Sequence, residues 1–288
     1  MALSKLSDDT QRVIFSQLRN LHNPSIAVAF GSASNELRVL TQAERQQLQA
    51  DCEAVAAIGR KAGKRSSKAL REATFIEWFG KGFSPDDLAL LGALCSVLPA
   101  LEQVHLWNYG AAGPTGVQRL GEMLGAGALP ALTSLNLNST HVGDAGALAL
   151  AAAMGRGALP RLKTLYVNYT SIGDVGLVAL APALRRRPME CIDFAGSKFG
   201  DEGIAALVAP PPPAAGALPP PAGVLTKLKL LYLGCTKVAD AGCAALASAL
   251  DSGALPALER LYLDNTPASA AARAYVRREG VEVWRSDL

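Results

Sequence analysis

The chain has 288 residues, 50% of them hydrophobic, and a formal net charge of +3 from 28 Lys and Arg against 25 Asp and Glu. This is ample apolar material for a core, and the charge is too small to indicate a nucleic-acid-binding protein. The cysteines and histidines form no metal-ligand pattern, so we expect reduced thiols and neither metal nor cofactor. Without a secretory signal or an apolar run of ~18 residues, we expect no membrane association and a cytoplasmic location, or alternatively a nuclear one.

Residues 1–72 are predicted to form a helical N-terminal segment. The run LSDDTQRVIFSQL, which begins at Leu6, places apolar residues on one helical face, and a second apolar cluster follows the helix break at Pro24. This frame resembles an F-box, the short helical module that docks on the Skp1-like adaptor of a ubiquitin ligase, although Ser7 stands where a proline is usual. The resemblance implies that these residues would dock the adaptor: Leu6, Val13, Ile14, Phe15, Leu18, Pro24 and Ile26. The same residues would serve equally well in a helical cap that closes the open core of the first repeat, and the cap is the favoured interpretation because exposed repeat ends generally need such a cover.

The second half of this segment is predicted to be one long helix and a connector. Thr41–Glu44 has the capping-box pattern, in which the hydroxyl bonds forward and the carboxylate bonds back. The helix should run to about Ile58 and end at Gly59 and Gly63. The basic cluster that follows has no aromatic residues interleaved for base stacking, so we interpret it as a solvated connector.

The centre of the chain contains the same unit twice, GALPALTSLNLNSTHVGDAGALALAAAM followed by GALPRLKTLYVNYTSIGDVGLVALAPAL. Each copy predicts a short strand, a turn and a helix. The unit recurs about every thirty residues, which is typical of a solenoid, because one strand and one helix cannot bury their apolar faces alone. The predicted strand centres are Ile76, Val104, Leu135, Leu165, Ile192, Leu231 and Leu261.

The pattern LPxLxxLxLxxTxVGDxGxxALAxAL resembles the ribonuclease-inhibitor-like class of leucine-rich repeat proteins. The resemblance implies an α/β solenoid over residues 73–288, with a parallel sheet on the concave face and helices on the convex face. A proline-rich insertion at 210–223 lengthens one connection, and residues 267–288 are expected to form a C-terminal cap with a helix over Ala268–Glu279 and a last strand over 281–284.

Each repeat carries a Gly-Asp-x-Gly motif, or a close variant, at the start of its helix. We expect the aspartate to cap the free amides of that helix, which explains the row of Asp144, Asp174, Asp201 and Asp240 better than a metal site does. The second glycine should allow close approach to the neighbouring helix. A threonine or serine replaces the asparagine that is usual at the corner after the strand, and its hydroxyl can still bond nearby backbone groups.

Side chains that alternate with the strand leucines should line the concave face. Tyrosine and tryptophan are concentrated there, which indicates a protein-binding surface, although tyrosine also suits strands in general. The predicted partner-binding residues are His105, Trp107, Asn136, Asn138, Tyr166, Asn168, Tyr169, Asp193, Tyr232, Tyr262 and Asp264.

No nucleotide-binding loop, zinc-protease motif or nucleophile elbow is present, and His105 lies three repeats from Asp193, so we predict a non-enzymatic protein. The main hypothesis is an interaction module that binds a protein partner on its concave face, in a sharper form as the substrate receptor of a ubiquitin ligase. The alternatives are a small-GTPase regulator of the Ran GTPase-activator type, whose members share this repeat, or a structural subunit of a larger assembly. We expect a monomer when the protein is isolated.

Overall fold

The computed structural model describes residues 7, 14, 24–33, 35–64, 66–78, 84–94, 98–107, 113–125, 127–209 and 225–284. The chain divides into two compact units, Met1–Ala73 and Thr74–Leu288. The proline-rich insertion, apart from its flanks, lies outside the described residues.

The described part of the N-terminal unit is helical. It contains α2 (Ser25–Gly31), α3 (Asn35–Leu40), α4 (Gln42–Lys61) and α5 (Ser67–Arg71). Ala27 of α2 and Leu48 of α4 form a buried cluster, and Phe30 and Cys52 pack against it. The apolar residues that follow Pro24 therefore join α2 to the long helix.

Two details of α4 differ from the predictions. The Thr41 hydroxyl does not cap the helix but donates to the carbonyl oxygen of Leu37 in α3 at 2.6 Å, the bond back to an earlier carbonyl that threonine hydroxyls commonly make. The helix also continues through Gly59 to Lys61. Ala62 is its C-cap, and Gly63 follows with a φ of 69°, the left-handed conformation that glycine adopts just after helix ends.

The second compact unit, Thr74–Leu288, contains the repeats, and we call it the repeat unit. It is built on one sheet of parallel strands in sequence order, and every neighbouring pair of strands is in register. The strands are β1 (Phe75–Glu77), β2 (Gln103–His105), β3 (Ser134–Asn136), β4 (Thr164–Tyr166), β5 (Cys191–Asp193), β6 (Leu230–Tyr232), β7 (Arg260–Tyr262) and β8 (Glu282–Trp284). The predicted centres pair across the sheet, from Ile76 with Val104 to Leu231 with Leu261, which confirms the strand assignments. In β1–β7 every central side chain is buried, the most exposed being Leu135 at 2%.

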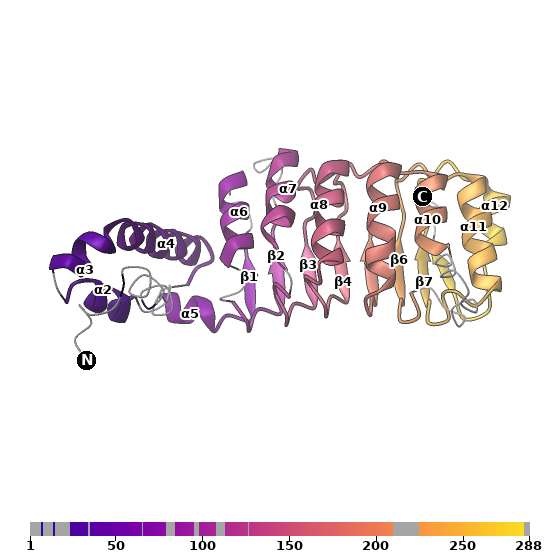
Figure 1. Ribbon diagram of the computed structural model, residues 1–288. Coiled ribbons are helices and arrows are strands. Elements are labelled where there is room, and N and C mark those ends of the chain that lie inside the picture. The colour runs from indigo at the N-terminus through magenta and orange to yellow at the C-terminus, as the bar shows by residue number, and fades with distance from the viewer. Residues whose placement is uncertain are drawn as a thin grey trace. The chain divides into compact units, whose positions relative to one another are not determined.

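One helix follows nearly every strand, and the helices stand side by side along one face of the sheet (Figure 1). They are α6 (Pro85–Leu94), α7 (Gly113–Met123), α8 (Gly143–Gly155), α9 (Asp174–Arg185), α10 (Asp201–Val208), α11 (Asp240–Asp251) and α12 (Ala270–Tyr275). Their inward leucines, such as Leu150, Leu180 and Leu246, are fully buried against the strands and the neighbouring helices. None of the described helices covers the other face of the sheet, which we call the open face.

The motif aspartates cap the helix of the following repeat, so the prediction that each caps its own helix is wrong. Oδ1 of Asp144 accepts the backbone amides of Gly173 and Gly176 at 2.7 and 3.0 Å. Asp174 bonds in the same way to the amides that open α10, and Asp201 to those that open α11. The aspartate lies in the first turn of its helix, so its carboxylate extends sideways to the next repeat.

The two other small residues of the repeat act as predicted. A Cβ on Gly176 would lie 2.6 Å from Oδ1 of Asp144, so only glycine allows this close approach. At the corner, the hydroxyls of Thr140 and Thr170 each donate to the carbonyl three residues earlier at 2.6 Å. The threonines thus close the turns that follow the strands.

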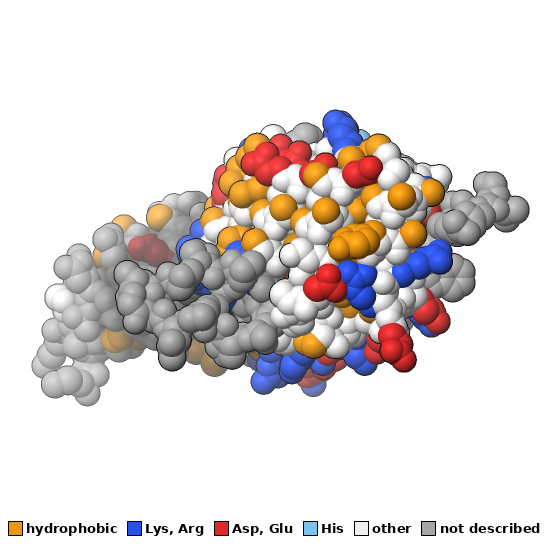
Figure 2. Space-filling model, turned by 90° about the vertical axis from the view of Figure 1, so that its right-hand side faces the viewer, with side chains coloured by type: hydrophobic (Ala, Val, Ile, Leu, Met, Phe, Trp, Pro, Cys, Tyr) orange, Lys and Arg blue, Asp and Glu red, His pale blue; other side chains and the backbone are white. Residues whose placement is uncertain are grey.

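The helix at the C-terminal end, α12, is shorter than the predicted helix over Ala268–Glu279. α12 begins where the Ser269 hydroxyl accepts the amide of Ala272 at 3.1 Å, and it ends at Tyr275 instead of Glu279. An isolated bridge between Arg278 and Val281 turns the chain into β8, which shortens the helix. Figure 2 shows the repeat unit from the side of α11 and α12, where hydrophobic side chains lie dispersed among polar and charged ones.

Candidate functional site

The residues predicted to bind a partner lie on the open face of the sheet. In β4 the central Leu165 is buried under the helices, so Thr164 and Tyr166 on either side of it point to the open face. Register pairing places the last residues of the strands in one row: Glu77, His105, Asn136, Tyr166, Asp193, Tyr232 and Tyr262. A second row, two residues further on, consists of Trp107, Asn138, Asn168, Ala195, Gly234 and Asp264. We call these two rows, together with Tyr169 beside them, the strand-end strip.

Hydrogen bonds hold the centre of the strip in place. Oδ1 of Asn136 accepts the amide of Asn138 at 3.0 Å, and Oδ1 of Asn138 accepts the amide of Asn168 at 3.0 Å. The Asn168 side chain donates to Oδ2 of Asp193 at 2.9 Å. These polar side chains therefore fix the strand ends relative to one another, and Asn136 is only 7% exposed. Burial raises the pKa of Asp193, and the hydrogen bonds from the Ala195 amide and from Asn168 oppose that rise.

The aromatic residues offer the larger contact area. Tyr232 and Tyr262 stack with their ring centroids 4.2 Å apart and their planes 8° from parallel. Burial, followed by the hydrogen bond with Tyr262, raises the pKa of Tyr232 to about 12, so its phenol is protonated at neutral pH. Tyr166 is half-buried, whereas Trp107 is 38% and Tyr169 60% exposed. The strip thus presents a fixed tyrosine pair on β6 and β7 and more exposed rings in the repeats of β2 and β4.

Tyr169 takes an unusual backbone conformation. Its φ is 52°, in the left-handed region, and Ser139 and Cys235 adopt the same conformation at the matching position of their repeats. The ring of Tyr169 lies over Gly196, where any Cβ would overlap it. Gly196 therefore makes room for the most exposed aromatic side chain of the strip.

Positive and negative side chains occupy different positions on the sheet. The cations lie at the strand starts and are paired with glutamates: Lys163 with Glu190 at 2.9 Å, Lys229 with Glu259 at 3.6 Å, and Arg260 with Glu282 at 3.2 Å. The strip itself carries the carboxylates of Glu77, Asp193 and Asp264. Desolvation lowers the pKa of His105 despite the opposing effect of Glu77, so this imidazole is mostly neutral at pH 7. The strip is therefore acidic.

The first residues of the strands also face the open side, and the sequence predictions did not include them. Phe75 packs edge-on against His105, with centroids 5.0 Å apart. Gln103, Ser134 and Thr164 line a shallow polar hollow of about 330 Å³ together with His105. Alternation on the other side of each strand leucine would have identified this row from the sequence.

The predicted adaptor-docking residues are only partly described. Leu6, Val13, Phe15 and Leu18 lie outside the described residues. Ile14 and Pro24 are half-buried, and Ile26 on α2 is 59% exposed. Of the three described members of this set, Ile26 is the one that is accessible.

Comparisons with known proteins agree with this geometry at the level of the fold. Residues 129–151 and 159–181 match the family described as Leucine Rich repeat. Together with the in-register parallel sheet and its row of helices, these matches show an α/β solenoid fold of leucine-rich repeats.

Two solved structures are similar over most of the chain. The Rad7 and Elc1 complex in yeast has 15% identity and a TM-score of 0.41, over 85% of this chain and 71% of that one. InlP of Listeria monocytogenes has 12% identity and a TM-score of 0.36, over 80% and 68%. No curated protein sequence matches the chain. Within the described residues, no group of His, Cys, Asp and Glu could hold a metal ion, and no helix has the length and apolarity to span a membrane.

Proposed function

We propose that the protein is an interaction module that binds a protein partner on the strand-end strip. The observation that carries the proposal is the combination of stacked and exposed aromatic rings on a sheet whose strand ends are fixed by hydrogen bonds. Tyrosine and tryptophan dominate the binding energy of many interfaces. Because the strip is already ordered, binding costs little conformational entropy.

The charges of the strip favour a basic segment of the partner. Tyr232 and Tyr262 lie in the same row as Asp193, which pairs with Tyr232, and Asp264 follows Tyr262 by two residues. A lysine or arginine side chain can contact a tyrosine face and a carboxylate at once, and each contact is attractive. The paired lysines at the strand starts do not compete for these carboxylates, because each is bonded to its own glutamate.

Affinity capture followed by mass spectrometry tests this proposal. We expect Tyr166→Ala/Tyr232→Ala to lose partners that the wild-type protein retains, with little change in melting temperature. Tyr275→Ala is the matched control, since Tyr275 is 64% exposed on α12, outside the strip. Equal recovery by all three proteins would rule out the strip as the binding face. Recovery of a small GTPase would instead favour the GTPase-regulator hypothesis. Recovery of a stable stoichiometric complex would favour a structural role in a larger assembly.

The finer form of the proposal is a ubiquitin-ligase substrate receptor, with the F-box-like segment on the adaptor and the repeats on the substrate. The exposed Ile26 supports it, because an adaptor needs accessible apolar residues there. We expect wild-type protein, but not Ile26→Asp, to retain a purified Skp1-like adaptor. Absence of adaptor binding by the wild-type protein would leave the segment as a cap. We also propose that the repeats are of the ribonuclease-inhibitor-like class, which is supported by the full helices of the repeats, such as α8.

A further inference from the structure

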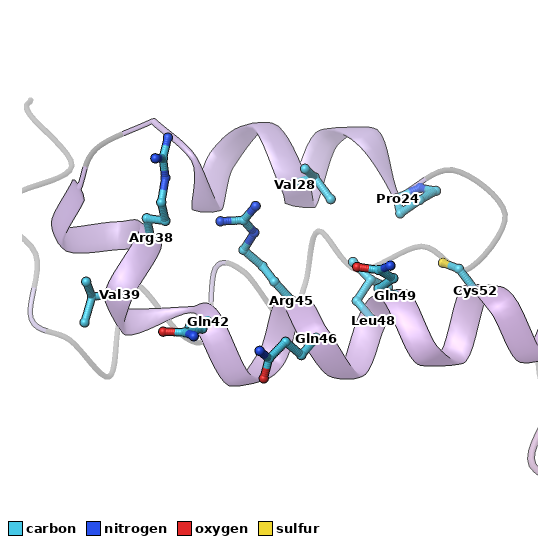
Figure 3. A pocket seen from close by; sticks show the side chains of 10 residues that line it. All are labelled: Pro24, Val28, Arg38, Val39, Gln42, Arg45, Gln46, Leu48, Gln49 and Cys52. Atoms are coloured by element: carbon cyan, nitrogen blue, oxygen red, sulfur yellow. The ribbon is translucent and has the colours of Figure 1, made fainter.

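A pocket of about 630 Å³ lies in the N-terminal unit, between α2, α3 and α4 (Figure 3). Small-molecule sites in proteins commonly have volumes of about 300–1,000 Å³. The pocket shares no residue with the strand-end strip, so it would serve a separate purpose from partner binding there.

The walls of the pocket are apolar along most of its length. Pro24 and Val28 of the α2 region face Leu48 and Cys52 of α4, and Val39 of α3 lies at the opposite end (Figure 3). Val28 is 40% exposed, and burial of such apolar surface is favourable. An aliphatic chain lying between the two helices would cover this apolar surface.

Two arginines stand at the end of the pocket near the α3–α4 corner. Arg38 and Arg45 both border this end, and the guanidinium of Arg45 extends into the space between α2 and α4 (Figure 3). Nε of Arg45 is buried and has no hydrogen-bond partner among the residues that the structure describes. A charged donor removed from water without an acceptor is costly, and a carboxylate is the acceptor that matches a guanidinium.

We propose that this pocket binds a small anionic amphiphile, with a carboxylate at Arg38 and Arg45 and an aliphatic chain that runs past Val28 and Leu48 toward Cys52. The arginines supply the donors for the head group, and the apolar walls supply the surface for the chain. The remaining lining consists of the neutral amides of Gln42, Gln46 and Gln49, so no described carboxylate in the lining repels the anion.

Calorimetric titration of the full chain with dodecanoate, below its micelle-forming concentration, tests the proposal. We expect dodecanoate to bind with one-to-one stoichiometry and dodecanol to bind about tenfold more weakly, as expected for the loss of one charge-assisted hydrogen bond. Arg45→Gln should weaken dodecanoate binding by a similar factor. Arg60→Gln is the matched control, because Arg60 is exposed on α4 and does not line the pocket.

Cysteine alkylation gives a second readout in the wild-type protein, independent of any variant. Dodecanoate should slow the reaction of Cys52 with N-ethylmaleimide and leave that of the exposed Cys235 unchanged, as resolved by mass mapping. Three results would each overturn the proposal: equal binding of the acid and the alcohol, full binding by Arg45→Gln, or no protection of Cys52. Binding of an acidic peptide without binding of dodecanoate would also overturn it and assign the pocket to a protein partner.

Discussion

Replacing Asp174 by alanine removes a carboxylate that joins two successive repeats. Its Oδ1 accepts the amides of Gly200 at 2.9 Å and Gly203 at 2.8 Å, at the start of α10. A helix-capping side chain contributes about 1 kcal/mol, and a hydrogen bond to a charged group about 1.5–3 kcal/mol. Alanine leaves both partly buried amides without this acceptor, so we expect the free energy of unfolding to fall by roughly 2–3 kcal/mol.

Urea unfolding followed by circular dichroism measures this loss as a lower midpoint with an unchanged slope. Asp174→Asn keeps an oxygen acceptor without the charge and should lose about half as much. Glu202→Ala is the control, because Glu202 is an exposed acid in the first turn of α10 and should change stability by no more than about 0.5 kcal/mol. If Asp174→Ala and Glu202→Ala give the same midpoint, the carboxylate does not stabilise the junction and the reasoning is refuted.

Three further predictions follow from burial and backbone geometry. Leu180→Ala should cost roughly 2–5 kcal/mol in urea unfolding, since Leu180 is fully buried, and a cost below about 1 kcal/mol would contradict this. Pro182→Ala should raise the urea midpoint, because α9 continues through this exposed proline without its backbone donor; a lower midpoint would count against it. Burial raises the pKa of the Cys191 thiol to about 11, so at pH 8 the exposed Cys235 should be alkylated well before Cys191, and the reverse order would disprove the assignment.

The sheet could be predicted from the sequence because its periodicity and its packing have the same cause. A single repeat, such as the one that contains Leu165, cannot bury its leucines alone, so similar repeats must stack. Stacking aligns the central residues of their strands. The same alternation identified the last residues of the strands as the open-face row. The predicted row covers only that side of the leucines and does not include the row that contains Phe75.

Side-chain contacts between helices and between repeats could not be predicted, because they depend on the relative positions of neighbouring elements in space. The sequence places Asp174 in the first turn of a helix, but only the stacking distance decides that its carboxylate reaches the amides of the next repeat. For the same reason the Thr41 hydroxyl was assigned to the wrong helix. The pocket at Arg45 depends on the packing of α2 against α4, for which the sequence carries no repeat to guide the prediction.

Site-specific photo-cross-linking tests the central claim most directly. A photoreactive residue in place of Tyr169 would lie in the strip, and one in place of Tyr275 would lie at a similarly exposed position on α12. We predict that a captured partner cross-links through position 169 and not through position 275. A partner that cross-links from position 275 and not from position 169 would contradict binding on the open face of the sheet.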